Sequence, residues 1–178
     1  MTALIVVDLQ KGIVSYPVAH PIGEVIKRSR SLADAFRSQG LPVVLVNVAG
    51  GAPGRTEQPR PGGPFPEGWT DLIPELGQQP SDILVTKRTW GAFASTDLGD
   101  QLKALGVTQV VVVGVATGTG VEATARQAYE EGLNVTLAVD AMTEMRPEAH
   151  DYSLKNVFPR LGETGSTQEI IDLLERSV

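Results

Sequence analysis

The stretch "VVVVGVATGTGVEATA" at residues 110–125 joins a run of valines to a glycine-rich turn and the start of a helical pattern. A β-branched run without polar alternation indicates a strand that is buried on both faces. A glycine-rich turn between such a strand and a helix suits either a phosphate-cradling loop or a turn that exposes a nucleophile. The first alternative indicates a dinucleotide-binding protein and the second a hydrolase.

Similar apolar runs alternate with amphipathic helical patterns along the rest of the chain. Strands are predicted at 3–8, 41–48, 82–87, 109–115 and 134–140, and helices at 23–40, 96–106, 121–132, 146–158 and over the final "TQEIIDLLERS". Ser166 and Glu169 are spaced as a capping box that opens this last helix. The alternation predicts a three-layer, doubly wound α/β fold, with helices on both faces of a mostly parallel sheet of five or six strands. The length of 178 residues predicts a single domain over 1–178.

Residues 49–80 break this alternation, because they are rich in glycine and proline. A domain boundary is one interpretation of such a segment. We favour a long ordered loop over the edge of the sheet, because loops of this length in compact domains tend to be functional or disordered.

The composition excludes several classes of function. The chain has no cysteine, which rules out disulfides, thiolate metal sites and thiol catalysis. Its net charge is −6 and its basic residues are scattered, so no nucleic-acid partner is expected. The first apolar run is ended by Asp8, and no apolar stretch is long enough for a membrane span. We therefore expect a cytoplasmic protein that acts on a small molecule.

Polar side chains follow the predicted strands at the edge where α/β sheets bind their ligands. Asp8 and Gln10 follow the first strand, Asn47 ends the second, and Lys87 ends the third. Burial of Asp8 would raise its pKa unless a partner stabilises the charge, and Lys87 is a suitable partner. The two charges indicate either a catalytic site or a structural ion pair.

The dinucleotide alternative rests on Gly118, Gly120 and Ala123, which fit the pattern G-x-G-x-x-A, and on Asp140 as a ribose-binding acid at the next strand end. The spacing argues against it. Residues 115–117 separate the valine run from the first of these glycines, and the pattern lies on the fourth strand–helix turn rather than the first.

The chain resembles the isochorismatase-like hydrolases, a superfamily that includes nicotinamidases and N-carbamoyl amidohydrolases. The resemblance covers the whole chain and rests on "ALIVVDLQKG" (3–12), "VTKRTWGAFASTDL" (85–98), "VVVVGVATGTGVEATARQAYEEG" (110–132) and "VTLAVDAM" (135–142). It implies that Asp8 is the catalytic acid/base and that Lys87 is its partner. It also places Gly120 where relatives carry their nucleophilic cysteine.

The resemblance implies further features of the site. A cis peptide is expected between Val115 and Ala116, and backbone N–H groups at Ala116 and Gly120 would stabilise an oxyanion. No metal or other cofactor is implied, because the segment after the second strand lacks the histidines of the nicotinamidases. The histidines of this chain, His20 and His150, are interpreted as surface residues. A homodimer or homotetramer is expected.

Some relatives work without the cysteine and cleave a vinyl ether, releasing pyruvate, with the aspartate as general acid. By this resemblance Asp8 would have to be protonated, which burial favours and Lys87 opposes. The candidate substrate-binding residues share a position near the predicted strand ends or on the long loop; they are Gln10, Asn47, Arg55, Arg88, Trp90, Phe93 and Thr117. The two arginines would hold substrate carboxylates, while the two aromatic residues would either line the pocket or pack in the core.

Overall fold

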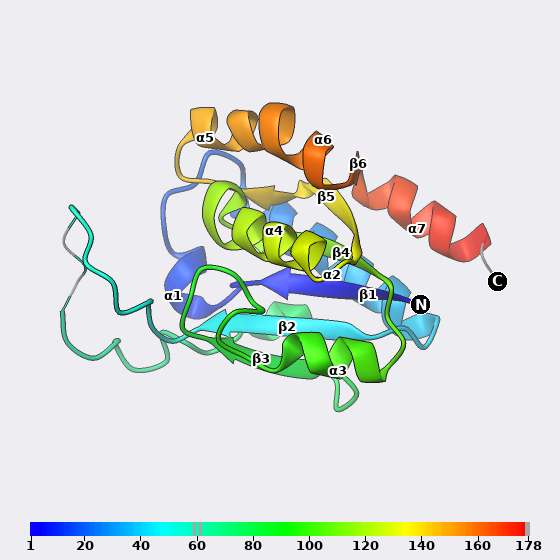
Figure 1. The fold of residues 1–178 in the computed structure, drawn as a ribbon, viewed down its shortest axis with the longest axis horizontal. Coiled ribbons are helices and arrows are strands. Elements are labelled where there is room, and N and C mark those ends of the chain that lie inside the picture. Colours follow the sequence, from blue (N-terminus) through cyan, green and yellow to red (C-terminus); the bar gives the residue numbers. More distant parts are fainter. Residues whose placement is uncertain (59, 61, 177–178) are drawn as a thin grey trace.

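Six parallel strands form one sheet in the computed structural model, which describes residues 1–58, 60 and 62–176. The strands are β1 (Thr2–Val7), β2 (Val43–Val48), β3 (Ile83–Lys87), β4 (Gln109–Val115), β5 (Asn134–Thr143) and β6 (Glu163–Gly165). Their order is β3-β2-β1-β4-β5-β6, so the chain starts at the centre, builds one half of the sheet and then the other (Figure 1). The direction of winding reverses between β1 and β4, which is where such sheets bind ligands. The predicted fold class is confirmed.

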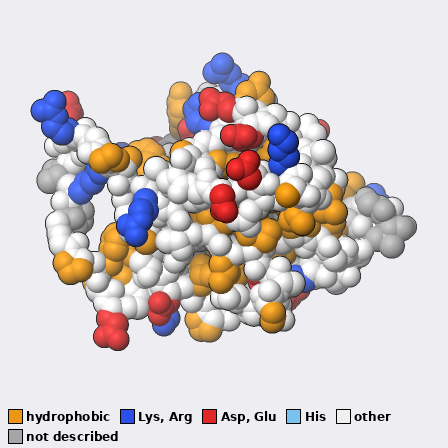
Figure 2. All heavy atoms as spheres, turned by 60° about the horizontal axis from the view of Figure 1, so that its bottom comes forward, with side chains coloured by type: hydrophobic (Ala, Val, Ile, Leu, Met, Phe, Trp, Pro, Cys, Tyr) orange, Lys and Arg blue, Asp and Glu red, His pale blue; other side chains and the backbone are white. Residues whose placement is uncertain are grey.

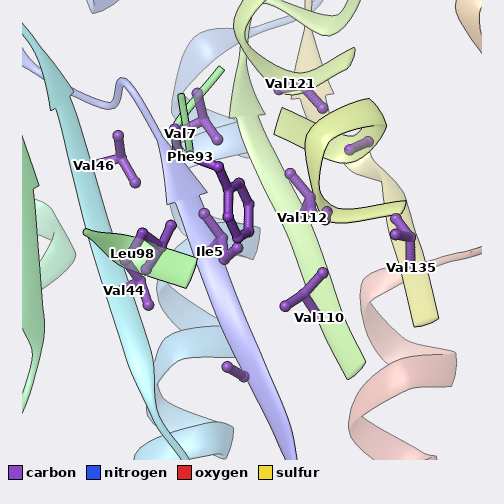
Figure 3. Close-up of a cluster of buried hydrophobic side chains, with 14 of the residues drawn as sticks. Ile5, Val7, Val44, Val46, Phe93, Leu98, Val110, Val112, Val121 and Val135 are labelled. Carbon is purple, nitrogen blue, oxygen red and sulfur yellow. The ribbon is translucent and has the colours of Figure 1, made fainter. Parts of the chain in front are cut away.

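Helices cover both faces of the sheet (Figure 1). They are α1 (Lys11–Val14), α2 (Ile22–Ser38), η1 (Pro74–Leu76), α3 (Leu98–Ala104), η2 (Thr117–Val121), α4 (Glu122–Glu130), α5 (Pro147–Tyr152), η3 (Ser153–Val157), α6 (Phe158–Leu161) and α7 (Thr167–Arg176). Helices α3, α4 and α6 pack on one face, and α2 and α7 on the other. Alternate residues of β1 point into the two layers, with Ile5 in the first core and Leu4 in the second. Figure 3 shows the first of these cores.

Several element boundaries differ from the sequence-based expectations. Strand β5 continues to Thr143, and the predicted helix at 121–132 is preceded by the wide turn η2. The predicted helix at 146–158 is divided into α5, η3 and α6. Strand β6 is only three residues long, and helix α1 only four, so neither carries a periodic pattern that would predict it. The capping box is confirmed, because the N–H and Oγ of Ser166 both donate to Glu169 Oε2, at 2.8 and 2.9 Å.

The long loop at 49–80 connects β2 to β3, which are neighbouring strands of the same sheet. It therefore does not separate two domains. Figure 1 shows it extending beyond the carboxyl ends of the strands. Its last part is fixed to α1, where the N–H groups of Lys11 and Gly12 donate to the carbonyls of Asp71 and Trp69. The loop is thereby attached beside the end of β1.

On the face drawn in Figure 2, lysine and arginine side chains lie apart from one another and form no stripe. In the described part of the chain, no helix is long and apolar enough to cross a membrane.

Gly114 leaves no room for a side chain where β4 pairs with β1. It lies in β4 beside β1 with a φ of +118°, and a Cβ there would overlap the carbonyl of Val7. We predict that Gly114→Ala lowers the free energy of unfolding by about 3 kcal/mol, through overpacking and an unfavourable φ. Gly132→Ala is the matched control, because Gly132 also has a positive φ (+83°) but faces open space. Urea unfolding should show a loss of only about 1 kcal/mol there, and equal losses in the two variants would contradict the steric explanation.

Candidate active site

Asp8 and Lys87 form a buried ion pair at the carboxyl edge of the sheet. Asp8 follows β1 and Lys87 ends β3, so the intervening strand β2 separates the two elements that carry them. Lys87 Nζ donates to Asp8 Oδ2 at 2.8 Å and to the carbonyl of Thr89 at 3.2 Å. The side chains of Lys87 and Asp8 are only 1% and 8% exposed. The sequence predicts this meeting of the two groups, and their catalytic roles remain a prediction.

The environment of Asp8 suits proton exchange near neutral pH. Burial raises the pKa of Asp8 from 3.8 to about 6, although the charge and hydrogen bond of Lys87 both lower it. Burial therefore has a larger effect on the pKa of Asp8 than the ion pair with Lys87. Asp8 Oδ1 is buried and has no hydrogen-bond partner among the described residues. Asp8 also has a φ of +54°, an uncommon backbone conformation for a residue other than glycine. One carboxyl oxygen is thus held by Lys87, and the other is left for a further group.

The turn after β4 places Gly120 against this carboxyl group. The peptide bond between Val115 and Ala116 is cis, as the resemblance implies, and η2 follows directly. A Cβ built on Gly120 would lie 3.2 Å from Asp8 Oδ2 and 3.3 Å from the carbonyl oxygen of Val115. A side chain at position 120 would therefore point at Asp8.

Helix α4 holds the segment after β3 against this turn. Thr124 Oγ1 donates to the carbonyl of Gly120 at 2.7 Å and accepts the N–H of Ala92 at 3.2 Å. One helical turn further, Gln127 Oε1 accepts the N–H groups of Phe93 and Ala94, at 2.9 and 3.3 Å. Sequence reasoning missed these two residues of α4. Their signal is the spacing of polar side chains three apart on the inner face of a helix.

Two of the candidate substrate-binding residues have amides that are already hydrogen-bonded to backbone, and their role in binding a substrate remains a prediction. Gln10 is fully buried, and its amide donates to the carbonyl of Val48 and accepts the N–H of the same residue. Asn47 Nδ2 donates to the carbonyl of Thr70 at 2.8 Å. Gln10 therefore connects the segment after β1 to the end of β2, and Asn47 connects the end of β2 to the long loop.

The remaining candidates divide between the surface and the interior. Phe93 is 7% exposed and packs in the core of Figure 3, whereas Trp90 is 68% exposed and lies outside that core. Arg55 and Arg88 are exposed, and Arg88 Nη1 donates to the carbonyl of Ala49. Thr117, the first residue of the turn η2, is fully buried.

The interpretation of His150 as a surface residue is wrong. His150 is 5% exposed, and its Nδ1 lies 2.7 Å from Thr117 Oγ1, whereas His20 is exposed. Helix α5 turns this side chain inward, and a single histidine in a short helix gives no sequence signal for that orientation. In the described residues no group of three or more His, Cys, Asp or Glu side chains is arranged to hold a metal ion.

The groups that the dinucleotide alternative requires have other partners. Asp140 Oδ1 accepts the N–H and the Oγ1 hydroxyl of Thr167, at 2.7 and 2.9 Å, at the start of α7. The N–H of Gly118 donates to Glu144 Oε2 at 3.0 Å. A ribose and a pyrophosphate would have to displace these hydrogen bonds.

A doubly wound sheet with a buried acid–base pair at its switch point is a common framework for enzymes that act on small molecules. The isochorismatase domain matches residues 2–169 of this chain. The chain belongs to the isochorismatase family, whose relatives include hydrolases.

Two curated relatives and one solved structure show the range of this family. The isochorismatase family protein YwoC of Bacillus subtilis is 40% identical, over 96% of this chain and 93% of its own. Nicotinamidase 3 of Arabidopsis thaliana is 31% identical, over 88% of this chain and 80% of its own. The structure of an isochorismatase family protein from Burkholderia thailandensis superposes with a TM-score of 0.92, at 39% identity, over 98% of this chain and 95% of that one.

Proposed function

We propose that this protein is a small-molecule hydrolase that works without a thiol, with Asp8 as its general acid/base. The single observation that carries the proposal is the state of Asp8. Its pKa is raised to about 6, its Oδ2 is held by Lys87, and its Oδ1 is buried without a hydrogen-bond partner among the described residues. A general acid or base works best when its pKa lies near the working pH.

Gly120 occupies the position of the missing nucleophile in this proposal. The direction of its absent side chain, toward Asp8 Oδ2, supports that assignment. An acyl-enzyme route needs a nucleophilic side chain, and the chain has no cysteine to supply a thiolate. We propose that water takes the place of the thiol as nucleophile. Backbone N–H groups at Ala116 and Gly120 remain the proposed donors to a developing oxyanion, since they need no side chain.

Vinyl-ether hydrolysis is the reaction that best suits an acid without a nucleophile. Protonated Asp8 would give its proton to the terminal enol carbon of the substrate. Water would then attack the resulting oxocarbenium carbon, and the hemiketal would collapse to pyruvate and an alcohol. Lys87 would hold Asp8 in place, and the exposed Arg88 and Arg55 would attract substrate carboxylates. Trp90 is exposed and lies three residues after Lys87 in the sequence, and we propose it as a further substrate contact. Assembly as a homodimer or homotetramer is part of the same proposal.

A non-catalytic or dinucleotide-binding protein is the competing hypothesis. The decisive experiment is a turnover screen with isochorismate, nicotinamide and N-carbamoyl compounds, with Asp8→Asn as the matched inactive variant. We expect turnover of isochorismate that Asp8→Asn abolishes. Saturable binding of NADH at micromolar concentration, followed by its fluorescence, would instead favour the role of Gly118, Gly120 and Asp140 in binding a cofactor.

The pH dependence of this reaction should report the protonation of Asp8. As a general acid Asp8 acts only when protonated, so we expect kcat/KM to be constant at low pH and to fall above about pH 6. The fall should approach about tenfold per pH unit, which is the behaviour of a single proton. The measurement is kcat/KM for isochorismate over about five pH units around the pKa of Asp8, from about pH 4 to about pH 9. Activity that instead rises through pH 6 would make Asp8 a general base and exclude the vinyl-ether mechanism.

A further inference from the structure

The turn after β4 is held from the side opposite to Asp8 by a buried carboxylate. Glu144, the residue that follows β5, is 5% exposed. Its Oε2 accepts the N–H of Gly118 at 3.0 Å, and its Oε1 accepts the N–H of Met145 at 2.9 Å. Burial of a carboxylate is unfavourable unless such donors compensate it. Glu144 therefore connects the end of β5 to the second residue of η2.

A second tether joins the first residue of the same turn to α5. Thr117 Oγ1 and His150 Nδ1 lie 2.7 Å apart, and both side chains are buried. Burial lowers the pKa of His150, and the nearby His20 lowers it further, whereas Asp151 and Glu144 raise it. The neutral imidazole is favoured, and it can exchange one hydrogen bond with the threonine hydroxyl in either tautomer.

The two sides of the turn face different groups. At Gly118 a Cβ would point toward Glu144 Oε2, 3.2 Å away, and toward Ser153 Oγ, 3.6 Å away. At Gly120, two residues later, it would point toward Asp8 Oδ2. The hydrogen bonds of Glu144 and His150 thus hold residues 117–118, while the opposite side of the same turn meets the proposed acid/base. A wide helical turn of five residues, Thr117–Val121, joins the two sides.

We propose that Glu144 and His150 are positioning residues, which hold residues 117 and 118 so that Gly120 presents its backbone to Asp8. This inference rests on the proposed function of the Asp8 site. Neither side chain needs to touch a substrate, because both act through the backbone of the turn. Supporting groups of this kind fix the geometry of a site to within the tolerance that its chemistry requires.

A thiol at position 120 gives a readout of turn geometry that does not depend on the substrate. Gly120→Cys creates the only thiol in the chain, since the sequence has no cysteine. The thiolate is favoured by the Lys87 ammonium and by the helix N-terminus, and it is opposed by the Asp8 carboxylate between them. The thiol pKa therefore reports the position of the side chain relative to all three groups. The measurements are the ultraviolet absorbance of the thiolate against pH and the rate of alkylation by iodoacetamide. Glu144→Ala and Glu144→Gln are compared in this background.

The direction in which the thiol pKa changes distinguishes a positioning role of Glu144 from a purely electrostatic one. Loss of a nearby negative charge alone would lower the thiol pKa in both Glu144 variants. Loss of the tether would move the thiol away from Lys87 and raise its pKa in Glu144→Ala, whereas the glutamine can still accept the N–H of Gly118. We expect alkylation roughly tenfold slower in Glu144→Ala, the effect of one unit in thiol pKa. In Glu144→Gln, which loses the charge but keeps the hydrogen bond, we expect alkylation equal to or slightly faster than in the parent. Glu148→Ala, which removes an exposed carboxylate on α5, is the control and should change nothing.

Faster alkylation in both Glu144 variants, or no change in either, would overturn the proposal. If Glu144→Ala does not fold, Thr117→Val removes only the bond to His150, and unchanged alkylation in that variant would overturn the proposal equally. An ordinary thiol pKa in the Gly120→Cys parent would have a different meaning. It would contradict the placement of Gly120 beside the Asp8 pair, and so the proposed function itself.

Discussion

Lys87→Met should destabilise the protein by about 3–5 kcal/mol at pH 8, because it leaves a buried carboxylate without its counter-charge. Lys87 is 1% exposed and Asp8 8% exposed, so water cannot take the place of the ammonium group without opening the site. Methionine preserves most of the length of the lysine side chain and adds no new charge. The hydrolase activity should be lost in the same variant, since Lys87 holds the proposed acid in position.

The destabilisation should grow with pH. In the wild type the folded-state pKa of Asp8, about 6, already exceeds its value of 3.8 in the unfolded chain. Asp8 therefore contributes stability that is fully present below pH 3.8 and is lost as the pH rises to about 6. Removal of Lys87 takes away the influence that lowers this pKa, so the loss continues above pH 6 by about 1.4 kcal/mol per unit. Urea unfolding on both sides of this pKa measures the difference.

Two controls make this result specific. Lys11→Met removes an ion pair with Asp71 whose side chains are both 55% exposed, and it should cost no more than about 1 kcal/mol at any pH. The double variant Asp8→Asn/Lys87→Met has no buried charge at the site and should recover much of the stability at high pH. Equal destabilisation of Lys87→Met on both sides of pH 6 would show that Asp8 does not depend on the lysine charge.

The fold was predictable from the sequence because its strongest signals are local. The β-branched run at 110–113 and the shorter runs in β1 and β2 are buried on both faces, so each strand shows as an uninterrupted apolar segment. The pairing of Asp8 with Lys87 was also predictable, since charged residues directly after buried parallel strands meet at one edge of the sheet. The strand order β3-β2-β1, which brings β1 and β3 to the same half of the sheet, comes from the structure.

The supporting residues were not predictable in the same way. Gln10 and Asn47 occupy strand ends, as substrate-binding residues do, but their amides satisfy backbone groups of neighbouring segments. Which carbonyl lies within reach of a polar side chain depends on the path of the loops, and a single sequence carries little information about that path. Glu144 and His150 were missed for a related reason, because a polar residue after a strand or in a short helix is ordinarily exposed.

The steric setting of Gly120 bears on the most informative substitution at the site. Gly120 lies within the helical turn η2 and has no positive φ, so a side chain there meets no left-handed backbone strain. A Cβ would nevertheless lie 3.1 Å from Val7 Cγ1 and 3.2 Å from Asp8 Oδ2, which is a tight contact. We expect Gly120→Cys to fold with a loss of about 1–2 kcal/mol, the lower part of the range for an added atom in a packed site.

The thiol of Gly120→Cys should be far more reactive than free cysteine. The new side chain would point toward the ion pair of Asp8 and Lys87. The ammonium of this pair favours the thiolate and its carboxylate opposes it, and we expect the ammonium to have the larger effect. The thiol also lies near the N-terminal end of α4, where the backbone N–H groups favour negative charge.

We therefore predict that Gly120→Cys reacts with iodoacetamide at neutral pH roughly tenfold faster than free cysteine, as a fall of one unit or more in the thiol pKa allows. Adding Lys87→Met should remove most of that gain, while Lys11→Met should leave it intact. The variant should also show whether the scaffold can use a nucleophile, through covalent trapping of an acyl group from nicotinamide or an N-carbamoyl compound, detected by mass spectrometry. A folded variant whose thiol is no more reactive than free cysteine, with or without Lys87, would mean that position 120 does not face the buried pair, and the assignment of Asp8 as the acid/base of this turn would then be lost.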